Sequence, residues 1–183
     1  MTRYDASPET AIRTVRAYKG PIIVDLDETL YLRNSTEDFM DSARPGLMAV
    51  MLMRLLDLVK PWRWTGGEVT RDVWRVGGIS VFFPWVWKRW RTRVSELAGS
   101  FTNKPLLTVL KARGTVPIVA TVGFRPIVSP LVAALGFPDA KIAAVRLNGF
   151  EDRRRGKLAL ATEALGEETI RRCLLLTDSI QDL

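Results

Sequence analysis

The sequence predicts an α/β protein whose largely parallel sheet is interrupted by a helical insert. Short apolar runs, each about as long as a buried strand, alternate along the chain with helical segments. This alternation is typical of a parallel sheet covered by helices. Residues 35–100 break the alternation, because that stretch predicts helices and no strand.

Four apolar runs are the expected strands, and the segments between them are expected helices. The strands are expected at 21–24, 116–120, 142–145 and 173–176. A first helix is expected after Ser7, a favourable N-cap that is followed by a proline. Three later helices are expected at 105–113, 125–135 and 157–165, with Asn103 as one N-cap and Gly114 and Gly136 as helix ends.

Composition limits the chemistry that the chain can perform. A chain of 183 residues with 47% hydrophobic residues supports one core domain with a smaller inserted module. It has no histidine and one cysteine, Cys173, which we expect to be buried. Histidine triads and zinc sites built from histidine or thiolate are therefore excluded, and a reducing compartment is expected. Catalytic acids, bases and metal ligands must come mainly from carboxylates.

The charge and hydropathy patterns concern location and partners. The first 20 residues have no continuous apolar region of the secretory type, and no stretch reaches the roughly 18–20 uninterrupted apolar residues that span a bilayer. We therefore expect a cytoplasmic protein, and association with a membrane surface stays open. The net charge of +7 favours an anionic partner without choosing between phosphates, acidic lipids and nucleic acid.

Polar residues stand where the expected strands end. Asp25 and Asp27 follow the first strand, Thr121 and then Gly123 follow the second, and Asp178 and Asp182 follow the last, while Lys157 opens the preceding helix. Ligands of open parallel sheets bind beyond the carboxyl ends of the strands. We therefore expect these groups to converge on one edge of the sheet.

The chemistry of these groups is mutually consistent. Residues two apart on an extended segment point to the same side, so Asp25 and Asp27 can share one site. With Asp178 and Asp182 they form a carboxylate cluster that needs a hard cation such as Mg²⁺. One carboxylate, Asp25, can attack phosphorus and the other can transfer protons. The Thr121 hydroxyl and the Lys157 ammonium can hold phosphoryl oxygens.

Four segments in chain order carry a recognisable pattern. They are Asp-Leu-Asp-Glu-Thr at 25–29, an apolar run ending in Thr121, Lys157 after a glycine, and an acidic pair at 178 and 182 after an apolar strand. The pattern resembles the four motifs of the haloacid dehalogenase superfamily, over residues 21–182. Within it, the chain looks like the phosphoserine-phosphatase-type members with a helical cap. It also looks like phosphatase-like domains fused to membrane prenyltransferases.

The resemblance implies a fold, a division of the chain and an activity. The fold is a Rossmann-like three-layer core from 1–34 and 101–183, with 35–100 as an inserted α-helical cap. The activity is a Mg²⁺-dependent phosphomonoester hydrolase that acts through an aspartyl-phosphate. The implied catalytic residues are Asp25, Asp27, Thr121 and Lys157. The implied phosphate-binding residues are Thr29, Thr121, Gly123 and Lys157, and the implied metal ligands are Asp25, Asp27, Asp178 and Asp182.

The insert and the basic residues leave alternatives open. All six tryptophans lie between Trp62 and Trp90. They either pack within a cap or form a face that contacts a membrane and presents a lipid-linked or amphipathic phosphate. The arginines at 153–155 are expected in a solvated basic turn, with phosphate recruitment as the other interpretation. A phosphomutase and a membrane-surface or interaction module that retains the fold are alternative functions. No nucleic-acid partner is expected.

Overall fold

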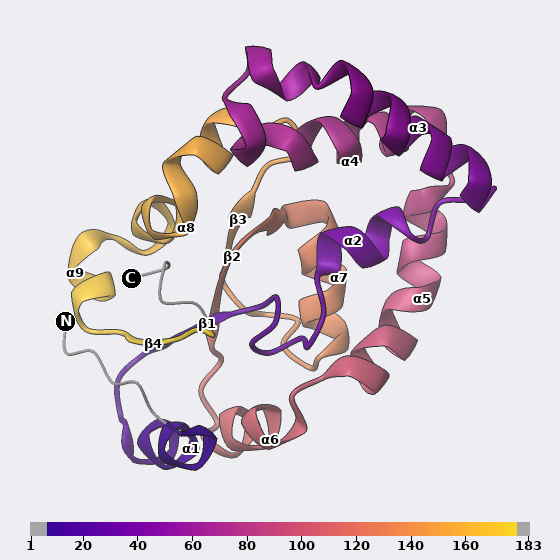
Figure 1. Ribbon diagram of the computed structural model, residues 1–183. Helices are drawn as coiled ribbons and strands as arrows, with labels where there is room; N and C mark the ends of the chain where they lie inside the picture. The colour runs from indigo at the N-terminus through magenta and orange to yellow at the C-terminus, as the bar shows by residue number, and fades with distance from the viewer. Residues whose placement is uncertain (1–6, 179–183) are drawn as a thin grey trace.

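Four short strands form one sheet in which all pairings are parallel. The computed structural model describes residues 7–178, and its strands lie in the order β3–β2–β1–β4 (Figure 1). In the register, Val24 of the central strand β1 pairs with Val119 of β2 and with Leu176 of β4. The strands are β1 Ile22–Asp25, β2 Ile118–Phe124, β3 Ile142–Val145 and β4 Leu174–Leu176. The predicted α/β class with a parallel sheet is confirmed.

Helices cover both sides of this sheet. Helix α8 packs against β2 and β3, and α7 packs against the same two strands from the opposite side (Figure 1). The helices are α1 Pro8–Ala17, α2 Ser35–Met40, α3 Gly46–Val59, α4 Arg71–Phe82, α5 Val86–Phe101, α6 Lys104–Ala112, α7 Arg125–Ala134, α8 Phe150–Leu165 and α9 Glu167–Arg171. Two 3₁₀ turns, η1 Pro61–Trp64 and η2 Gly67–Thr70, join α3 to α4.

Helix ends follow the capping residues in the sequence. The hydroxyl of Ser7 accepts a hydrogen bond from the backbone N–H of Thr10 at the start of α1. The Asn103 side chain accepts one from the Leu106 N–H at the start of α6. Gly114 has a positive φ of 68° just after α6, a conformation that glycine adopts without steric cost. These local signals explain why the boundaries of α1 and α6 are predictable.

The predicted bounds of β2 and α8 are wrong. Strand β2 begins at Ile118 rather than at 116, and it continues to Phe124, so Thr121 and Gly123 lie within it rather than after it. The β2–β3 register shifts between Ala120 and Phe124, and such an irregularity lets pairing resume beyond Thr121. Helix α8 begins at Phe150 rather than at Lys157, but it is broken at Gly156, whose φ of 77° and ψ of 175° are not helical. Lys157 therefore opens the second helical stretch of α8.

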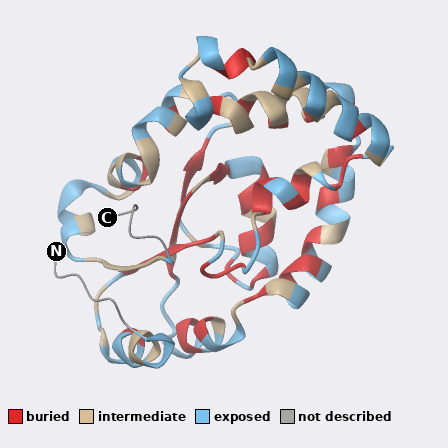
Figure 2. Cartoon of the chain, viewed as in Figure 1, coloured by how far each residue is buried: buried red, intermediate tan, exposed pale blue. Residues whose placement is uncertain are grey.

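The hydrophobic core extends from the sheet into the helices between β1 and β2. Figure 2 shows β1, β2 and β3 largely buried and β4 of intermediate burial, and the side chains of Val24 and Val119 are fully inaccessible. Trp90 of α5 is also fully buried, and its indole N–H donates to the carbonyl oxygen of Ile127 in α7 at 3.0 Å. Cys173, expected to be buried, is only partly so, and burial raises the pKa of its thiol.

The segment 35–100 is helical in all its regular elements, as expected. It packs through α2 and α5 against α7, and through η2 against α8. None of the helices within residues 7–178 has the length and apolar character needed to cross a membrane. The division into a core and a cap stays a prediction.

Candidate active site at the carboxyl edge of the sheet

The sheet reverses its winding direction beside β1. The chain passes from β1 to β2 and on to β3 in one direction, and then returns to the other side of β1 for β4. In open parallel sheets such a switch point leaves a crevice beyond the carboxyl ends of the two strands. Here Asp25 is the last residue of β1 and Asp27 follows two residues later, and Thr177 and Asp178 follow β4.

Asp25 is the last residue of β1 and forms a buried ion pair with Lys157. The Lys157 Nζ lies 2.7 Å from Asp25 Oδ2, and the two side chains are 10% and 7% exposed. The hydroxyl of Thr177 lies 3.5 Å from the same carboxylate oxygen. The break at Gly156 precedes Lys157 directly, so the ammonium group reaches the end of β1 from α8.

Asp27 lies two residues further along and is fixed by two other elements. Its Oδ1 accepts a hydrogen bond of 2.6 Å from the backbone N–H of Ser35, at the start of α2. Its Oδ2 accepts one of 3.0 Å from the hydroxyl of Thr121 in β2. Burial raises the pKa of Asp27, and the hydrogen bonds from Ser35 and Thr121 together with the charge of Lys157 oppose that rise without cancelling it.

The backbone of Gly123 lies so close to Thr121 and Asp27 that its position has no room for a side chain. Its backbone N–H donates to the Thr121 hydroxyl at 2.9 Å. A Cβ atom at this position would lie 2.9 Å from a methyl group of Val128 and 3.4 Å from Asp27 Oδ2. The glycine therefore preserves the contact between Thr121 and Asp27.

Thr29 joins the loop after β1 to the end of β4. Its hydroxyl donates to Asp178 Oδ1 at 3.1 Å and accepts from the Asp178 backbone N–H at 3.0 Å. The Thr29 carbonyl oxygen accepts a hydrogen bond of 3.1 Å from the Asn103 side chain, at the start of α6. Between Asp27 and Thr29, Glu28 has a positive φ of 64°, which turns the chain sharply at this point.

The contacts described above join the expected site residues between 7 and 178 in three groups. Direct hydrogen bonds or ion pairs link Asp25 to Lys157, Asp27 to Thr121, Thr121 to Gly123, and Thr29 to Asp178. Asp182, the remaining expected metal ligand, lies outside the described residues.

Sequence reasoning missed two groups that contact the carboxylates. The Ser35 backbone N–H bonds Asp27, and the Thr177 hydroxyl contacts Asp25. The signal for the Ser35 N–H was Asn34, whose side chain caps α2. It accepts hydrogen bonds from the N–H groups of Thr36 and Glu37. It marks a helix start, where backbone N–H groups have no partner within the helix.

The expected environment of Arg153 is wrong. Instead of lying in a solvated turn, it belongs to the first part of α8, and its side chain is 11% exposed. Its guanidinium forms a 2.6 Å ion pair with Asp72 of α4 and lies over the ring of Phe124. Arg153 thus joins the helical segment 35–100 to the elements that carry the site.

The donor set fits a magnesium ion in its chemistry. Asp25, Asp27 and Asp178 offer carboxylate oxygens, and no imidazole or thiolate lies among the site residues. Magnesium prefers oxygen ligands, binds one or two carboxylates and completes its shell with waters and substrate phosphate. Within residues 7–178, no three acidic or cysteine side chains are gathered tightly enough to hold a metal ion unaided.

No protein-family model and no curated protein matches this chain. The inference about function therefore depends on the motifs and on the contacts described above.

Proposed function

We propose that the protein is a magnesium-dependent phosphomonoester hydrolase of the haloacid dehalogenase type, with Asp25 as its nucleophile. The observation that carries the proposal is the arrangement at the switch point of the sheet. One carboxylate is paired with an ammonium group at 2.7 Å, and a second carboxylate two residues later is bonded to a hydroxyl at 3.0 Å. A nucleophile, a proton carrier and two groups that bind phosphoryl oxygens are the parts that phosphoryl transfer requires.

In the first half of the reaction, a carboxylate oxygen of Asp25 attacks the phosphorus atom. A bond forms between that oxygen and phosphorus, and the bond between phosphorus and the leaving oxygen breaks. Asp27 donates its proton to the leaving oxygen, so that the alcohol departs neutral. The product on the protein is an acyl phosphate at Asp25.

In the second half, water replaces the alcohol. Asp27, now a carboxylate, takes a proton from the water as its oxygen attacks phosphorus. The bond between phosphorus and Asp25 breaks, and inorganic phosphate leaves with Asp25 restored. The Thr121 hydroxyl and the Lys157 ammonium bind phosphoryl oxygens throughout, and Lys157 offsets the negative charge that gathers between the carboxylates.

Asp25 and Asp178 would hold the magnesium ion, together with Asp182 beyond the described residues, while the Asp27 carboxyl group, also expected as a ligand, would serve proton transfer instead. When bound, the ion supplies positive charge that lets an anionic phosphate approach anionic carboxylates. Asp178 has its carboxylate oriented by the Thr29 hydroxyl and lies two residues after the end of β4, the strand next to β1.

The proposal includes a Rossmann-like three-layer core, from 1–34 and 101–183, and a cap formed by 35–100. Contacts between the helical segment and α8 support a cap role. Arg153 pairs with Asp72, and the ring of Phe150 packs edge-on against Trp74 at 5.8 Å. Because α8 also carries Lys157, this segment is well placed to limit which phosphomonoesters reach Asp25.

Hydrolysis of p-nitrophenyl phosphate tests the activity. We expect turnover with Mg²⁺, its loss with a chelator, and its loss in Asp25→Asn with an unchanged circular dichroism spectrum. Asp139→Asn is the matched control, because this aspartate is exposed and lies in the loop before β3. Turnover by Asp25→Asn at the wild-type rate would refute the assignment of the nucleophile.

A further inference from the structure

Helix α3 presents an apolar surface to solvent. Eight of its residues are exposed, and seven of those are apolar. A surface helix normally turns its polar side outward, so this helix is inverted relative to the common pattern. We call these residues the α3 outer face: Leu47, Met48, Val50, Met51, Arg54, Leu55, Leu58 and Val59.

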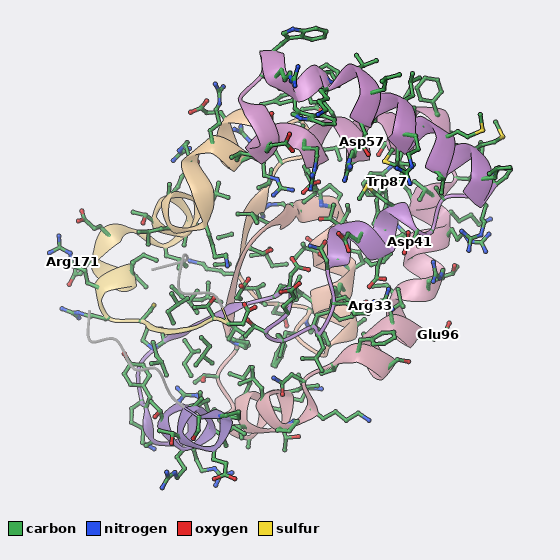
Figure 3. All side chains as sticks on the ribbon, in the orientation of Figure 1. Arg33, Asp41, Asp57, Trp87, Glu96 and Arg171 are labelled. Carbon is green, nitrogen blue, oxygen red and sulfur yellow. The ribbon has the colours of Figure 1, made fainter. Side chains whose placement is uncertain are left out.

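The opposite side of α3 is already used for packing. Leu52 and Leu56 lie against Gly78 of α4, where a Cβ atom would be 3.6 Å and 3.3 Å from their methyl groups. Asp57 forms a 2.5 Å ion pair with Arg75 of α4, and Figure 3 labels Asp57 on the side of α3 next to α4. Figure 2 shows the outer side of α3 exposed along its length. The outer face is therefore a second apolar side, and no other part of residues 7–178 covers it.

The net charge of the chain is concentrated around this helix. Residues 44–93 contain ten arginines and lysines and three acids, and the other residues contain 17 of each sign. The entire excess of +7 therefore belongs to the segment that contains α3. The three acids, Asp57, Glu68 and Asp72, are each paired with an arginine. These arginines offset the negative charges of the three acids, so the exposed cations dominate the local electrostatic field.

Cations and aromatic rings flank the outer face. Arg54 lies within the face, and exposed Arg44 and Arg63 lie just before and after α3. The indole N–H of Trp85 donates to the Arg44 carbonyl oxygen at 2.7 Å, which places the start of α5 beside the start of α3. Trp64, 78% exposed, follows the other end of the helix. Tryptophan and basic residues at the rim of an apolar face are typical of elements that lie at a membrane surface.

We propose that the α3 outer face docks on an anionic lipid bilayer, with the helix lying parallel to the membrane plane. Seven apolar side chains enter the boundary between headgroups and acyl chains, while the surrounding cations attract acidic lipid. The charge also argues against a second copy as the occupant, because two copies would bring two segments of excess positive charge together.

This surface differs from the tryptophan face considered for the insert. Trp62 and Trp90 are buried, and Trp74 and Trp87 are partly buried, so most of the indoles are part of the packing. For example, the ring centroids of Trp87 and Phe39 are 4.5 Å apart. Seven of the twelve exposed large apolar side chains between residues 44 and 93 belong to α3, whose sequence contains no aromatic residue.

Vesicle flotation with two variants, each of which introduces one carboxylate, tests the proposal. Leu58 is 81% exposed, so Leu58→Glu puts a carboxylate in the face without removing a core contact. Val116→Glu is the control, since Val116 is 54% exposed and lies before β2, at the opposite edge of the sheet from the site. Vesicles of phosphatidylcholine with phosphatidylglycerol are compared with phosphatidylcholine alone at low salt.

We expect wild type and Val116→Glu to float with the anionic vesicles, and Leu58→Glu to bind about tenfold less tightly or worse. Binding should weaken as salt is raised. Absence of wild-type binding to anionic vesicles, or equal binding by Leu58→Glu with its melting temperature unchanged, would overturn the proposal. A concentration-dependent dimer that Leu58→Glu abolishes, without vesicle binding, would assign the face to a second copy instead. Because Asp25→Asn should float like wild type, failure of the hydrolase proposal and failure of this one are distinguishable.

Discussion

The ion pair between Lys157 and Asp25 predicts a large stability change whose size follows from its burial. With both side chains at most 10% exposed, the charges are nearly withdrawn from water. Replacing Lys157 by methionine keeps the aliphatic length but removes the cation, so the buried Asp25 carboxylate loses the 2.7 Å contact with the ammonium group. Breaking a buried pair in this way costs about 3–5 kcal/mol. We expect a loss near the lower limit, since the Thr177 hydroxyl stays within 3.5 Å of the carboxylate.

Urea unfolding at neutral pH without magnesium measures this effect. A loss of about 3 kcal/mol moves the midpoint by roughly 1–2 M urea for a chain of this size. Lys141→Met is the control, because this lysine is exposed just before β3 and should change stability by less than about 0.5 kcal/mol. Adding Asp25→Asn to Lys157→Met should recover stability, because the double variant no longer buries a carboxylate from which the ammonium group has been removed. A loss below about 1 kcal/mol in the single variant, or no recovery in the double variant, would refute the reasoning.

Three further predictions concern the pH dependence, the core and the site. Hydrogen bonds from Arg146 hold the pKa of Asp152 below its ordinary 3.8, so Asp152→Asn should lower the free energy of unfolding at neutral pH. In urea titrations, the difference between this variant and wild type should fade as the pH drops below 3.8. Trp90→Ala should cost about 3–5 kcal/mol by calorimetry, because it empties a fully buried site and frees a carbonyl, whereas exposed Trp64→Ala should cost little. Gly123→Ala should reduce kcat for an aryl phosphate, because the added methyl crowds the hydroxyl and carboxylate beside it; full activity would count against that geometry.

Much of the sheet was predictable because its strands are short, continuous apolar runs. The run 142–145 corresponds to β3 as predicted, and β1 follows the run 21–24 with a shift of one residue. Such runs are buried on both sides, so their hydrophobicity alone identifies them. Strand β2 was predicted too short, because Thr121 and Gly123 resemble the residues that end a strand. Pairing with β3 across an irregularity overrides that local signal.

The site residues were predictable as types but not as contacts. Their positions after apolar runs indicated a common edge, and the distances among Asp25, Lys157, Asp27 and Thr121 follow from the strand order β3–β2–β1–β4, which no local pattern determines. The role of Arg153 was missed for a similar reason. Its partner Asp72 lies 81 residues away, and a run of arginines normally indicates solvated surface.

The sequence left the exposure of α3 open. A helix this apolar is compatible with packing inside a cap and with a face that contacts a membrane. The structure buries one side against α4 and leaves the α3 outer face open. Sequence patterns report which residues are apolar, but what covers them depends on the tertiary arrangement or on another molecule.

Acid quenching during turnover tests the central claim most directly. The wild-type protein is mixed with p-nitrophenyl phosphate and Mg²⁺, denatured in acid within the first turnovers, digested and analysed by mass spectrometry. We predict one added phosphoryl group on the peptide that contains Asp25, removable by hydroxylamine as an acyl phosphate is, and absent from Asp25→Asn. Turnover that leaves the Asp25 peptide unmodified, or a phosphoryl group on another residue, would contradict the assignment of Asp25 as the nucleophile.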